Sequence, residues 1–330
     1  MVYCIEVLKM SRNFSWSRII ICILILIIIP VFWHLKNIDY SARQNEHRRK
    51  LGAVYMTLNN PFYEVIDEEI RTVAENHDDI LISRNPALNV DKQIEEIQYL
   101  IDDGVELIFI NPVDWTKMEP ALKAAYEAKI PVIAIDTNVE NDKYVACTVV
   151  SDNYLAGVQC AEHLLSHSSE GKIALLKHSQ ARSSIDRIQG FSDKISENKN
   201  FEIVAEAECL GQLELAMPAM ETMLENFPEI NVVMALNDPA AMGAIAALQN
   251  LNRLNSVKVY GVDGVPETKE MIYSHRMTAT AGQSPKKIGR IAAETAYKIL
   301  DGKPVEKIIR LPTKLLSDEN INMNNIEGWD

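Results

Sequence analysis

The sequence lacks the short motifs that mark many nucleotide-dependent and metal-dependent enzymes. Neither GxSxG, a Walker phosphate loop, HExxH nor GxGxxG occurs among its 330 residues. Without a nucleophile elbow, a phosphate cradle or a zinc-binding helix, no catalytic centre is visible. We therefore predict that the protein is not an enzyme. A cytoplasmic enzyme on an α/β scaffold is the weaker alternative.

Cysteine is also scarce. The five cysteines are odd in number, widely spaced and never arranged as CxxC, and they lie at Cys4, Cys22, Cys147, Cys160 and Cys209. This pattern excludes a disulfide framework and predicts buried free thiols in the main part of the chain. His163 and His167, four residues apart on a predicted helix, could form a metal pair. We favour exposed histidines near a helix end and expect no metal and no cofactor.

Positive charge is in short supply beyond the amino terminus. The net charge is −13, but residues 1–50 carry +5, so residues 51–330 carry −18. An acidic body argues against a nucleic-acid surface. It also suits a neutral or cationic small ligand better than a polyanion.

One long apolar run interrupts the basic amino-terminal segment, from Ile19 to Trp33, with Trp16 before it. Its length lies between a signal-peptide core and a comfortable membrane span, and no small-x-small cleavage site follows it. We predict an uncleaved signal anchor with a juxtamembrane linker over residues 1–50. A cleaved signal peptide and a buried core helix are the alternatives. Basic residues are more numerous after the run than before it, and this count alone would favour a cytoplasmic carboxyl side.

From residue 51 onward, short apolar runs alternate with segments of helical period. The runs predict strands at 51–56, 80–83, 106–110, 131–135, 145–150, 172–176, 201–205, 231–235, 256–262 and 277–281. The intervening segments predict helices at 62–76, 91–103, 116–128, 153–166, 213–226, 238–250 and 285–301. Such alternation is typical of α/β proteins with parallel sheets. About ten strands favour two lobes, with the first change near residues 151–153.

Polar side chains follow many of these predicted strands. They are Asn111, Asp136 with the adjacent Thr137, Asn237, Asp263 and Gln283, while the first strand leads into the loop Thr57–Tyr63 with Asn60, Phe62 and Tyr63. Open α/β sheets bind ligands at the carboxyl ends of their strands. A carboxylate there can accept protons from two adjacent hydroxyls, and amides tolerate either hydroxyl direction. For Asp152 and Asp238, a helix N-cap is the competing interpretation.

Several stretches carry a family resemblance. They are TLNNPFY at 57–63, FINPVD at 109–114, IPVIAID at 130–136, SDN at 151–153, RIQGF at 187–191, ALNDPAAMGAIAAL at 235–248, GVDGVPE at 261–267 and TATAGQSP at 278–285. In order and spacing, residues 51 to about 316 resemble the type I periplasmic sugar-binding proteins of ABC importers, and the ribose-binding proteins most. The resemblance implies two Rossmann-like lobes, joined by three hinge strands, that close over a ligand.

The implied lobes are residues 51–151 plus 284–311 and residues 152–283 plus 312–330, after an anchor at 1–50. The resemblance also implies that Asn60, Asn111 and Asp136 bind ligand hydroxyls from the first lobe, and Asn237, Asp263 and Gln283 from the second lobe and hinge. Phe62 and Tyr63 would pack on the ligand ring. Arg187 in RIQGF is interpreted as structural. The family would place the soluble part on the extracytoplasmic side.

The sequence departs from the ribose-type pattern at four places. Thr137 and Ile185 stand where arginines are expected, Met56 stands where a small polar residue is expected, and an aromatic residue is missing near 209–213. Arg182 could replace one lost arginine only along a different backbone path. Each charged hydrogen bond that is lost removes about 1.5–3 kcal/mol. These departures indicate a different sugar, a polyol or a related small ligand.

Two partners suit an anchored binding protein. It could deliver its ligand to a membrane permease, or it could present its bound form to a receptor such as a sensor histidine kinase, which would make it a chemosensing module. The lactose-repressor family shares the same core, but its members begin with a DNA-binding helix-turn-helix. Here an apolar run and an acidic body replace that element.

Overall fold

The computed structural model describes residues 21, 25–31, 48–321, 324 and 326–329. Residues 25–31 are helical with exposed side chains. Within the described ranges, no helix has both the length and the apolarity that a membrane span requires. Most of the apolar run Ile19–Trp33 lies outside those ranges, so the anchor stays a prediction. Arg49–Asp330 form one compact unit, to which the rest of the description applies.

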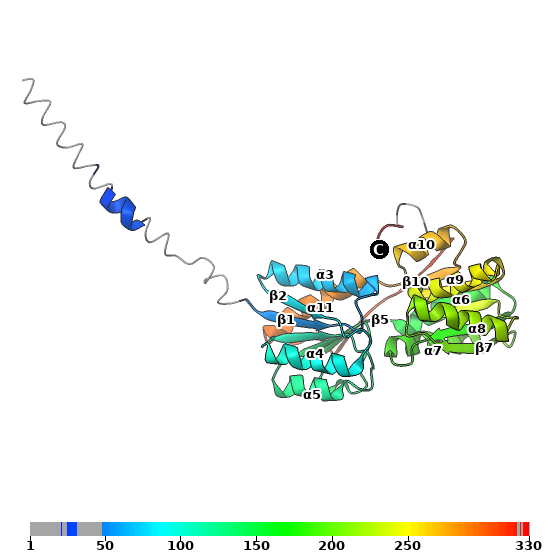
Figure 1. Cartoon of the computed structure of the whole chain (residues 1–330), viewed down its shortest axis with the longest axis horizontal. Coiled ribbons are helices and arrows are strands. Elements are labelled where there is room, and N and C mark those ends of the chain that lie inside the picture. The colour runs from blue at the N-terminus through cyan, green and yellow to red at the C-terminus, as the bar shows by residue number, and fades with distance from the viewer. Residues whose placement is uncertain (1–20, 22–24, 32–47, 322–323, 325, 330) are drawn as a thin grey trace, which may run out of the picture. The chain divides into compact units, whose positions relative to one another are not determined.

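The unit contains two six-stranded sheets, each at the centre of an α/β lobe (Figure 1). The first sheet has the order β11-β5-β4-β3-β1-β2, and all its neighbouring strands are parallel. Its strands are β1 (Lys50–Val54), β2 (Ile80–Arg84), β3 (Leu107–Ile110), β4 (Val132–Ile135), β5 (Cys147–Ser151) and β11 (Ile308–Leu311).

The second sheet has the order β12-β10-β9-β8-β6-β7. Its strands are β6 (Gly171–Lys177), β7 (Phe201–Glu208), β8 (Val232–Ala235), β9 (Lys258–Asp263), β10 (Ala279–Gly282) and β12 (Lys314–Ser317). Four of its five pairs are parallel, but β12 runs antiparallel to β10 at the edge. The prediction of parallel sheets is confirmed for nine of the ten strand pairs and is wrong at this edge, where β12 enters directly from β11 of the other lobe.

Helices cover both faces of each sheet. They are α3 (Pro61–Asn76), α4 (Val90–Asp102), α5 (Glu119–Glu127), α6 (Asn153–His167), α7 (Arg182–Ile195), α8 (Leu213–Asn226), α9 (Asp238–Asn250), α10 (Pro266–Tyr273) and α11 (Pro285–Leu300), with 3₁₀ turns at Asp142–Tyr144 and Leu254–Ser256. In the first lobe α3 packs with α11, and in the second α6 packs with α7 and α8 with α9. Two apolar clusters in each lobe fill the space between sheet and helices. Burial on both faces explains why strands such as β3 and β4 are wholly apolar.

The chain passes between the two lobes three times. β5 of the first sheet leads into α6 of the second lobe, β10 of the second sheet leads into α11 beside α3, and β11 leads directly into β12. These passages bring the carboxyl ends of strands from both sheets toward one another, and the polar residues that follow those strands lie there.

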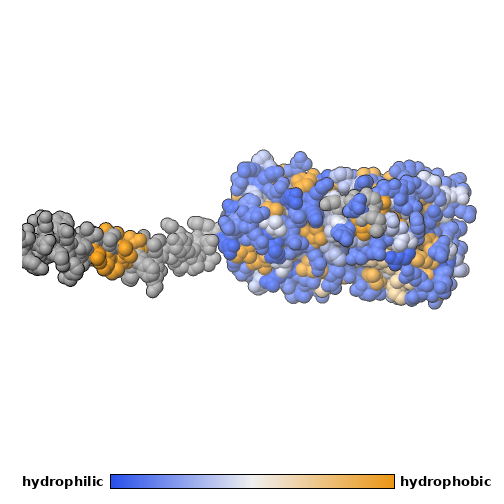
Figure 2. Space-filling model, turned by 90° about the horizontal axis from the view of Figure 1, so that it is seen from above, coloured by the Kyte–Doolittle hydropathy of each residue, from blue (hydrophilic) through white to orange (hydrophobic). Residues whose placement is uncertain are grey.

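Ten predicted strands and seven predicted helices have counterparts in the structure. The pattern missed α7, α10, β11 and β12. The cysteines Cys147, Cys160 and Cys209 are buried free thiols, as predicted, whereas Cys4 and Cys22 lie outside the described residues. The surface of the compact unit is mostly hydrophilic, with scattered apolar patches (Figure 2).

Candidate functional site

A small cavity of about 20 Å³ lies where the two lobes meet. Both lobes contribute to its wall. It is lined by Met56, Thr57, Asn60, Phe62, Tyr63 and Asp136 of the first lobe and by His178, Ala181, Ser183, Arg187, Leu210, Gly211, Gln212, Leu236, Asn237 and Asp263 of the second. Both polar and apolar side chains line the cavity, which suits a small ligand that has both kinds of surface.

Asp136 lies directly after β4 and is 2 % exposed. Its Oδ2 accepts hydrogen bonds from the Tyr63 hydroxyl at 3.2 Å and from Asn111 Nδ2 at 3.2 Å. Its Oδ1 has no hydrogen-bond partner. Burial raises the pKa of this carboxyl, although the nearby guanidinium opposes that shift. The backbone holds Asp136 at φ +66°, a conformation that non-glycine residues adopt rarely, although aspartate adopts it more often than most.

Asp263 ends β9 on the opposite side of the cavity and is also 2 % exposed. Its Oδ1 accepts a hydrogen bond from Gln283 Nε2 at 2.7 Å, whereas its Oδ2 has no partner. Its backbone φ is +140°. Burial raises the pKa of Asp263 well above its ordinary value, and two other carboxylates, those of Asp238 and Asp136, add to that shift.

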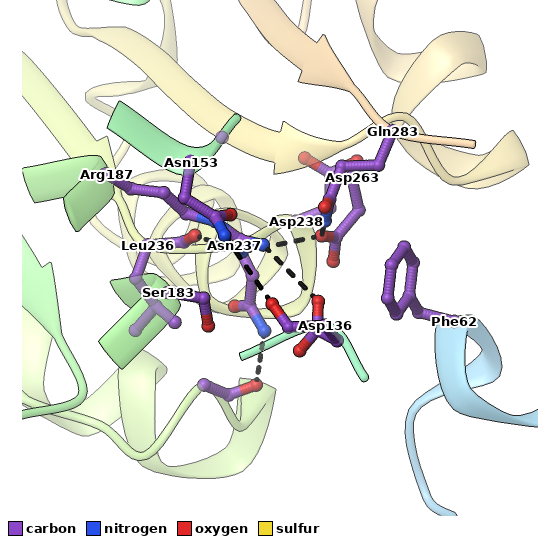
Figure 3. A network of polar contacts seen from close by, with 12 residues as sticks. Phe62, Asp136, Asn153, Ser183, Arg187, Leu236, Asn237, Asp238, Asp263 and Gln283 are labelled. Atoms are coloured by element: carbon purple, nitrogen blue, oxygen red, sulfur yellow. Dashed lines mark hydrogen bonds and ion pairs between the residues drawn. The ribbon is translucent and has the colours of Figure 1, made fainter. Parts of the chain in front are cut away.

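Arg187 lies between these two carboxylates (Figure 3). Its guanidinium nitrogens are 3.8 Å from Asp136 Oδ1 and 3.6 Å from Asp263 Oδ1. The same side chain donates to Asn153 Oδ1 at 2.8 Å and to the Leu236 carbonyl at 3.0 Å, so its position is fixed from behind. One buried cation thus faces two buried anions, and with both carboxylates ionised this group of three has a net charge of −1.

Arg187 was interpreted from the sequence as structural, but it lines the cavity and forms ion pairs with both candidate carboxylates. The motif RIQGF supports the family resemblance, but the helix α7 that carries it is not among the predicted helices. Arg182, by contrast, lies outside the cavity wall. It pairs with Asp186 at 2.8 Å and lies over the Trp115 ring at 5.2 Å.

The first-lobe loop brings two aromatic rings and an amide to the cavity. Asn60 caps α3, its Oδ1 accepting a hydrogen bond from the Phe62 backbone N–H at 3.0 Å. Phe62 and Tyr63 pack edge to face, with centroids 5.6 Å apart. A proline at the start of α3 fixes the chain direction here. All three predicted residues therefore reach the cavity wall.

Three other predicted residues lie behind the wall. Asn111 is fully buried and connects Asp136 to the Met56 backbone N–H, which donates to its Oδ1 at 3.1 Å. Gln283 supports Asp263 from behind, and its own Oε1 has no partner. Thr137 accepts a hydrogen bond from the Ser183 backbone N–H of the other lobe at 2.9 Å. These residues position the cavity groups and do not line the cavity.

Two acidic residues were alternatively interpreted as N-caps. Asp152 caps α6 by accepting from the Leu155 N–H at 3.1 Å. Asp238 does not cap α9, because Asn237 has that role, accepting from the Ala240 N–H at 3.0 Å. Asn237 also lines the cavity and donates to the Gly211 carbonyl at 3.1 Å (Figure 3).

Asp238 is fully buried and stabilises the loop that follows Asp263. It accepts from the backbone N–H groups of Gly264 and Val265 at 2.8 and 3.0 Å. The hydroxyls of Thr268 and Thr280 donate to it at 2.5 and 2.6 Å. Four donors therefore satisfy this carboxylate, in contrast to the half-satisfied Asp263.

The interpretation of His163 and His167 as exposed histidines is wrong for His163, which is buried against Tyr260, whereas His167 is exposed. Their rings stack 4.1 Å apart, His163 contacts the Tyr260 hydroxyl, and His167 pairs with Glu319. Across the described part of the chain, no group of three or more candidate side chains could hold a metal ion. A third histidine, His178, lines the cavity, and burial lowers its pKa, which favours the neutral ring.

Together, the fold and the cavity define a two-lobed α/β binding protein that encloses a small ligand between its lobes. The chain belongs to the family described as "Periplasmic binding protein domain", whose model matches residues 51–304. The resemblance seen in the sequence motifs is thereby confirmed.

Curated relatives span nearly the same length. The chain is 31 % identical to the "Ribose import binding protein RbsB" of Bacillus subtilis, over 83 % of this chain and 89 % of that protein. It is 29 % identical to the protein of the same name from Escherichia coli, over 81 % and 90 %.

Solved structures of ABC transporter solute-binding proteins have a similar fold. An ABC transporter solute-binding protein from Mycobacterium smegmatis with bound glycerol is 31 % identical, with a TM-score of 0.79 over 83 % of this chain and 96 % of that one. One from Bacillus halodurans with bound myo-inositol is 25 % identical, with a TM-score of 0.78 over 84 % and 97 %.

Proposed function

We propose that this protein is an extracytoplasmic solute-binding protein that closes over a small neutral polyhydroxy ligand, a monosaccharide or a polyol, and delivers it to an ABC importer. The observation that carries the proposal is the pair of buried carboxylates, Asp136 and Asp263, each with one oxygen that lacks a hydrogen-bond partner. Both residues line one cavity between the lobes.

The chemistry of the cavity supports this ligand class. Two acceptor oxygens without partners call for O–H or N–H donors, and Arg187 can donate to a ring oxygen or a hydroxyl. The carboxylate excess disfavours an anionic ligand. Phe62 and Tyr63 supply apolar surface for one face of a ring, and Leu210 and Leu236 supply it from the other lobe.

The cavity is small in this structure. Its volume of about 20 Å³ is well below the roughly 300–1,000 Å³ of typical ligand pockets, so the lobes would have to move apart to admit a sugar. Relatives named for ribose and solved structures with myo-inositol or glycerol fit the same chemistry. Because Thr137 and Ile185 replace two arginines of the ribose-type pattern, we propose a sugar or polyol other than ribose.

We further propose that the lobes move as two bodies, residues 51–151 plus 284–311 against residues 152–283 plus 312–330, and that the amino-terminal segment anchors them to the membrane. The nine residues Asn60, Phe62, Tyr63, Asn111, Asp136, Thr137, Asn237, Asp263 and Gln283, with Arg187 added, form the site. The permease of an importer is the proposed partner. The sensory role gains no support from the named relatives, which are import proteins.

A thermal-shift screen of the full-length protein in mild detergent tests the ligand class. The panel contains pentoses, hexoses, polyols and nucleosides. A ligand at a hundredfold excess over its Kd stabilises by about 2.7 kcal/mol, which raises Tm by roughly 5–10 °C for a domain of this size. The shift should disappear in Asp136→Asn.

The matched control is Asp152→Asn, which keeps a capping side chain on α6 away from the cavity wall and should preserve the shift. If no sugar or polyol shifts Tm, or if Asp136→Asn leaves the shift intact, the proposed ligand site is wrong. Unchanged sugar uptake in cells that lack the protein would contradict the importer role.

A further inference from the structure

The last described residues connect the two lobes. After β12 the chain lies against the second lobe, where Ile321 packs on the apolar cluster beneath α8 and α9. Eight residues later, Trp329 packs on the apolar cluster of the first lobe, which contains Phe62 and Ile66 of α3. In Figure 1 the described residues near the C-terminus are drawn close to α10. Ile321 and Trp329 therefore contact different lobes.

Trp329 contacts a ring that lines the ligand cavity. Its indole lies edge to face against Phe62, with centroids 5.8 Å apart and an interplanar angle of 65°. Phe62 in turn packs edge to face on Tyr63, whose hydroxyl donates to Asp136. A row of three aromatic rings thus leads from the C-terminal segment to the carboxylate of the first lobe.

The second lobe holds the same segment through a buried lysine. Lys269 of α10 is 3 % exposed, and its Nζ donates to the carbonyl of Gly328, the residue before Trp329. The helix α10 begins three residues after Asp263. Trp329 also lines a hollow of about 330 Å³ together with Gly264, Lys269 and Gln283, the last of which donates to Asp263. The segment therefore contacts Phe62, the neighbour of Tyr63, and shares the lining of this hollow with Gln283.

We propose that Trp329 is a positioning residue of the ligand site, and that the segment Gly328–Trp329 is a strap that links the lobes in the closed form. This inference rests on the proposed function only in taking the cavity as the ligand site. Trp329 covers the outer face of Phe62 and fixes its ring against the cavity. Lys269 keeps the strap in place from the other lobe.

Opening the cleft would separate Lys269 from Phe62, because the two belong to different lobes. The strap cannot keep both contacts when that distance grows, so its docking and lobe closure favour each other. A contact made only in the closed form raises the population of that form and thereby the apparent affinity.

Hydrogen exchange on the ligand-free, full-length protein tests this proposal without any sugar, so the outcome is independent of the ligand screen. The variant is Trp329→Ala, and the readout is the exchange rate of the backbone amides at residues 56–66. Aromatic pair energies correspond to roughly two- to tenfold changes in an equilibrium. We expect exchange in this segment to accelerate by that factor, and Trp329→Phe to restore most of the protection.

Two further variants separate positioning from general stability. Lys269→Met keeps a buried apolar stem but removes the donor to Gly328, and it should accelerate exchange at residues 56–66 although it lies in the other lobe. Tyr126→Ala removes an aromatic pair of similar spacing, with Tyr144 at 5.4 Å, on the distant helix α5, and should leave residues 56–66 unchanged.

The proposal fails if Trp329→Ala leaves exchange at residues 56–66 unchanged. It also fails if exchange rises equally throughout the first lobe, including β3 and β4, because Trp329 would then be an ordinary core residue. Normal protection at residues 56–66 in Lys269→Met would contradict the link between the lobes.

Discussion

Replacing Asp263 by asparagine should stabilise the ligand-free protein and weaken ligand binding at the same time. Asparagine has nearly the same shape, tolerates a positive φ and can still accept the hydrogen bond from Gln283. It removes a buried charge with one unpartnered oxygen. Such a group costs about 1–3 kcal/mol, so Tm at neutral pH should rise by roughly 3–10 °C. The lost charged hydrogen bond should weaken ligand binding about 10- to 100-fold.

Asp238→Asn is the matched control. Asp238 is equally buried, and burial raises its pKa as well. Its oxygens, however, accept from four donors. An asparagine whose oxygen takes the place of Oδ2 keeps three of these donors, but its amide nitrogen removes the acceptor of the Thr280 hydroxyl, which should cost about 1–3 kcal/mol. The same substitution should therefore have opposite signs at the two positions.

The difference between wild type and Asp263→Asn should depend on pH. The folded-state pKa of Asp263 is raised above its ordinary value of 3.8, chiefly by burial. The folded protein then binds the proton more tightly than the unfolded chain, so this contribution to stability is complete at acid pH and is lost as pH rises through the raised pKa. The advantage of the variant should be smallest near pH 4 and grow toward neutrality.

Thermal unfolding across this pH range gives the difference in Tm. Titration calorimetry with the ligand identified by the screen gives the change in Kd. The reasoning is refuted if Asp263→Asn lowers Tm at neutral pH as Asp238→Asn does. It is also refuted if the variant binds the ligand within threefold of wild type.

Three further substitutions test the same site. Arg187→Met leaves both cavity carboxylates without their cation and should cost about 3–5 kcal/mol, measured by denaturant unfolding; a loss below 1 kcal/mol would show that the ion pairs contribute little. Tyr63→Phe removes one of two donors to Asp136 and should weaken binding by about fivefold with little change in Tm; unchanged affinity by calorimetry would contradict the role of this hydroxyl. Gly157→Ala places a methyl group 1.9 Å from the Arg187 carbonyl oxygen, so α6 and α7 must separate, at a cost of about 1–3 kcal/mol; a variant with wild-type Tm and affinity would disprove this tight packing.

The sequence predicted the parts of the site that follow strands. Asp136, Asn237 and Asp263 come at the ends of apolar runs, and a buried parallel strand is recognisable from such a run alone. The local pattern therefore placed these residues at one edge of their sheets, and the structure places them on the wall of one cavity.

Arg187 could not be found in this way because it lies inside a helix. Its partners, Asn153 and the Leu236 carbonyl, are 34 and 49 residues away in the sequence. The packing of α6 against α7 brings Asn153 to Arg187, and the fold of the second sheet brings the end of β8; no local pattern encodes either. The strand β12 was missed for a related reason, because its short sequence pairs with β10 only after the chain has crossed between the lobes.

The predicted strand ends also differ in what their side chains do. Asn111 and Gln283 lie directly after strands, as predicted, but their side chains donate to the neighbouring carboxylates of Asp136 and Asp263. Sequence position fixes the edge of the sheet, whereas the contacts between side chains decide which residue faces the cavity and which supports it.

The hydrogen bond between Thr137 and the Ser183 N–H has a consequence for how the cleft closes. The residue before α7 makes no side-chain cap of its own, so the first turn of that helix is completed by a hydroxyl from the opposite lobe. Such a cap is worth about 1 kcal/mol, or roughly fivefold in the equilibrium between open and closed forms. Closure would therefore complete the first turn of the helix that carries Arg187, while Asn153 and the Leu236 carbonyl hold the guanidinium from within its own lobe.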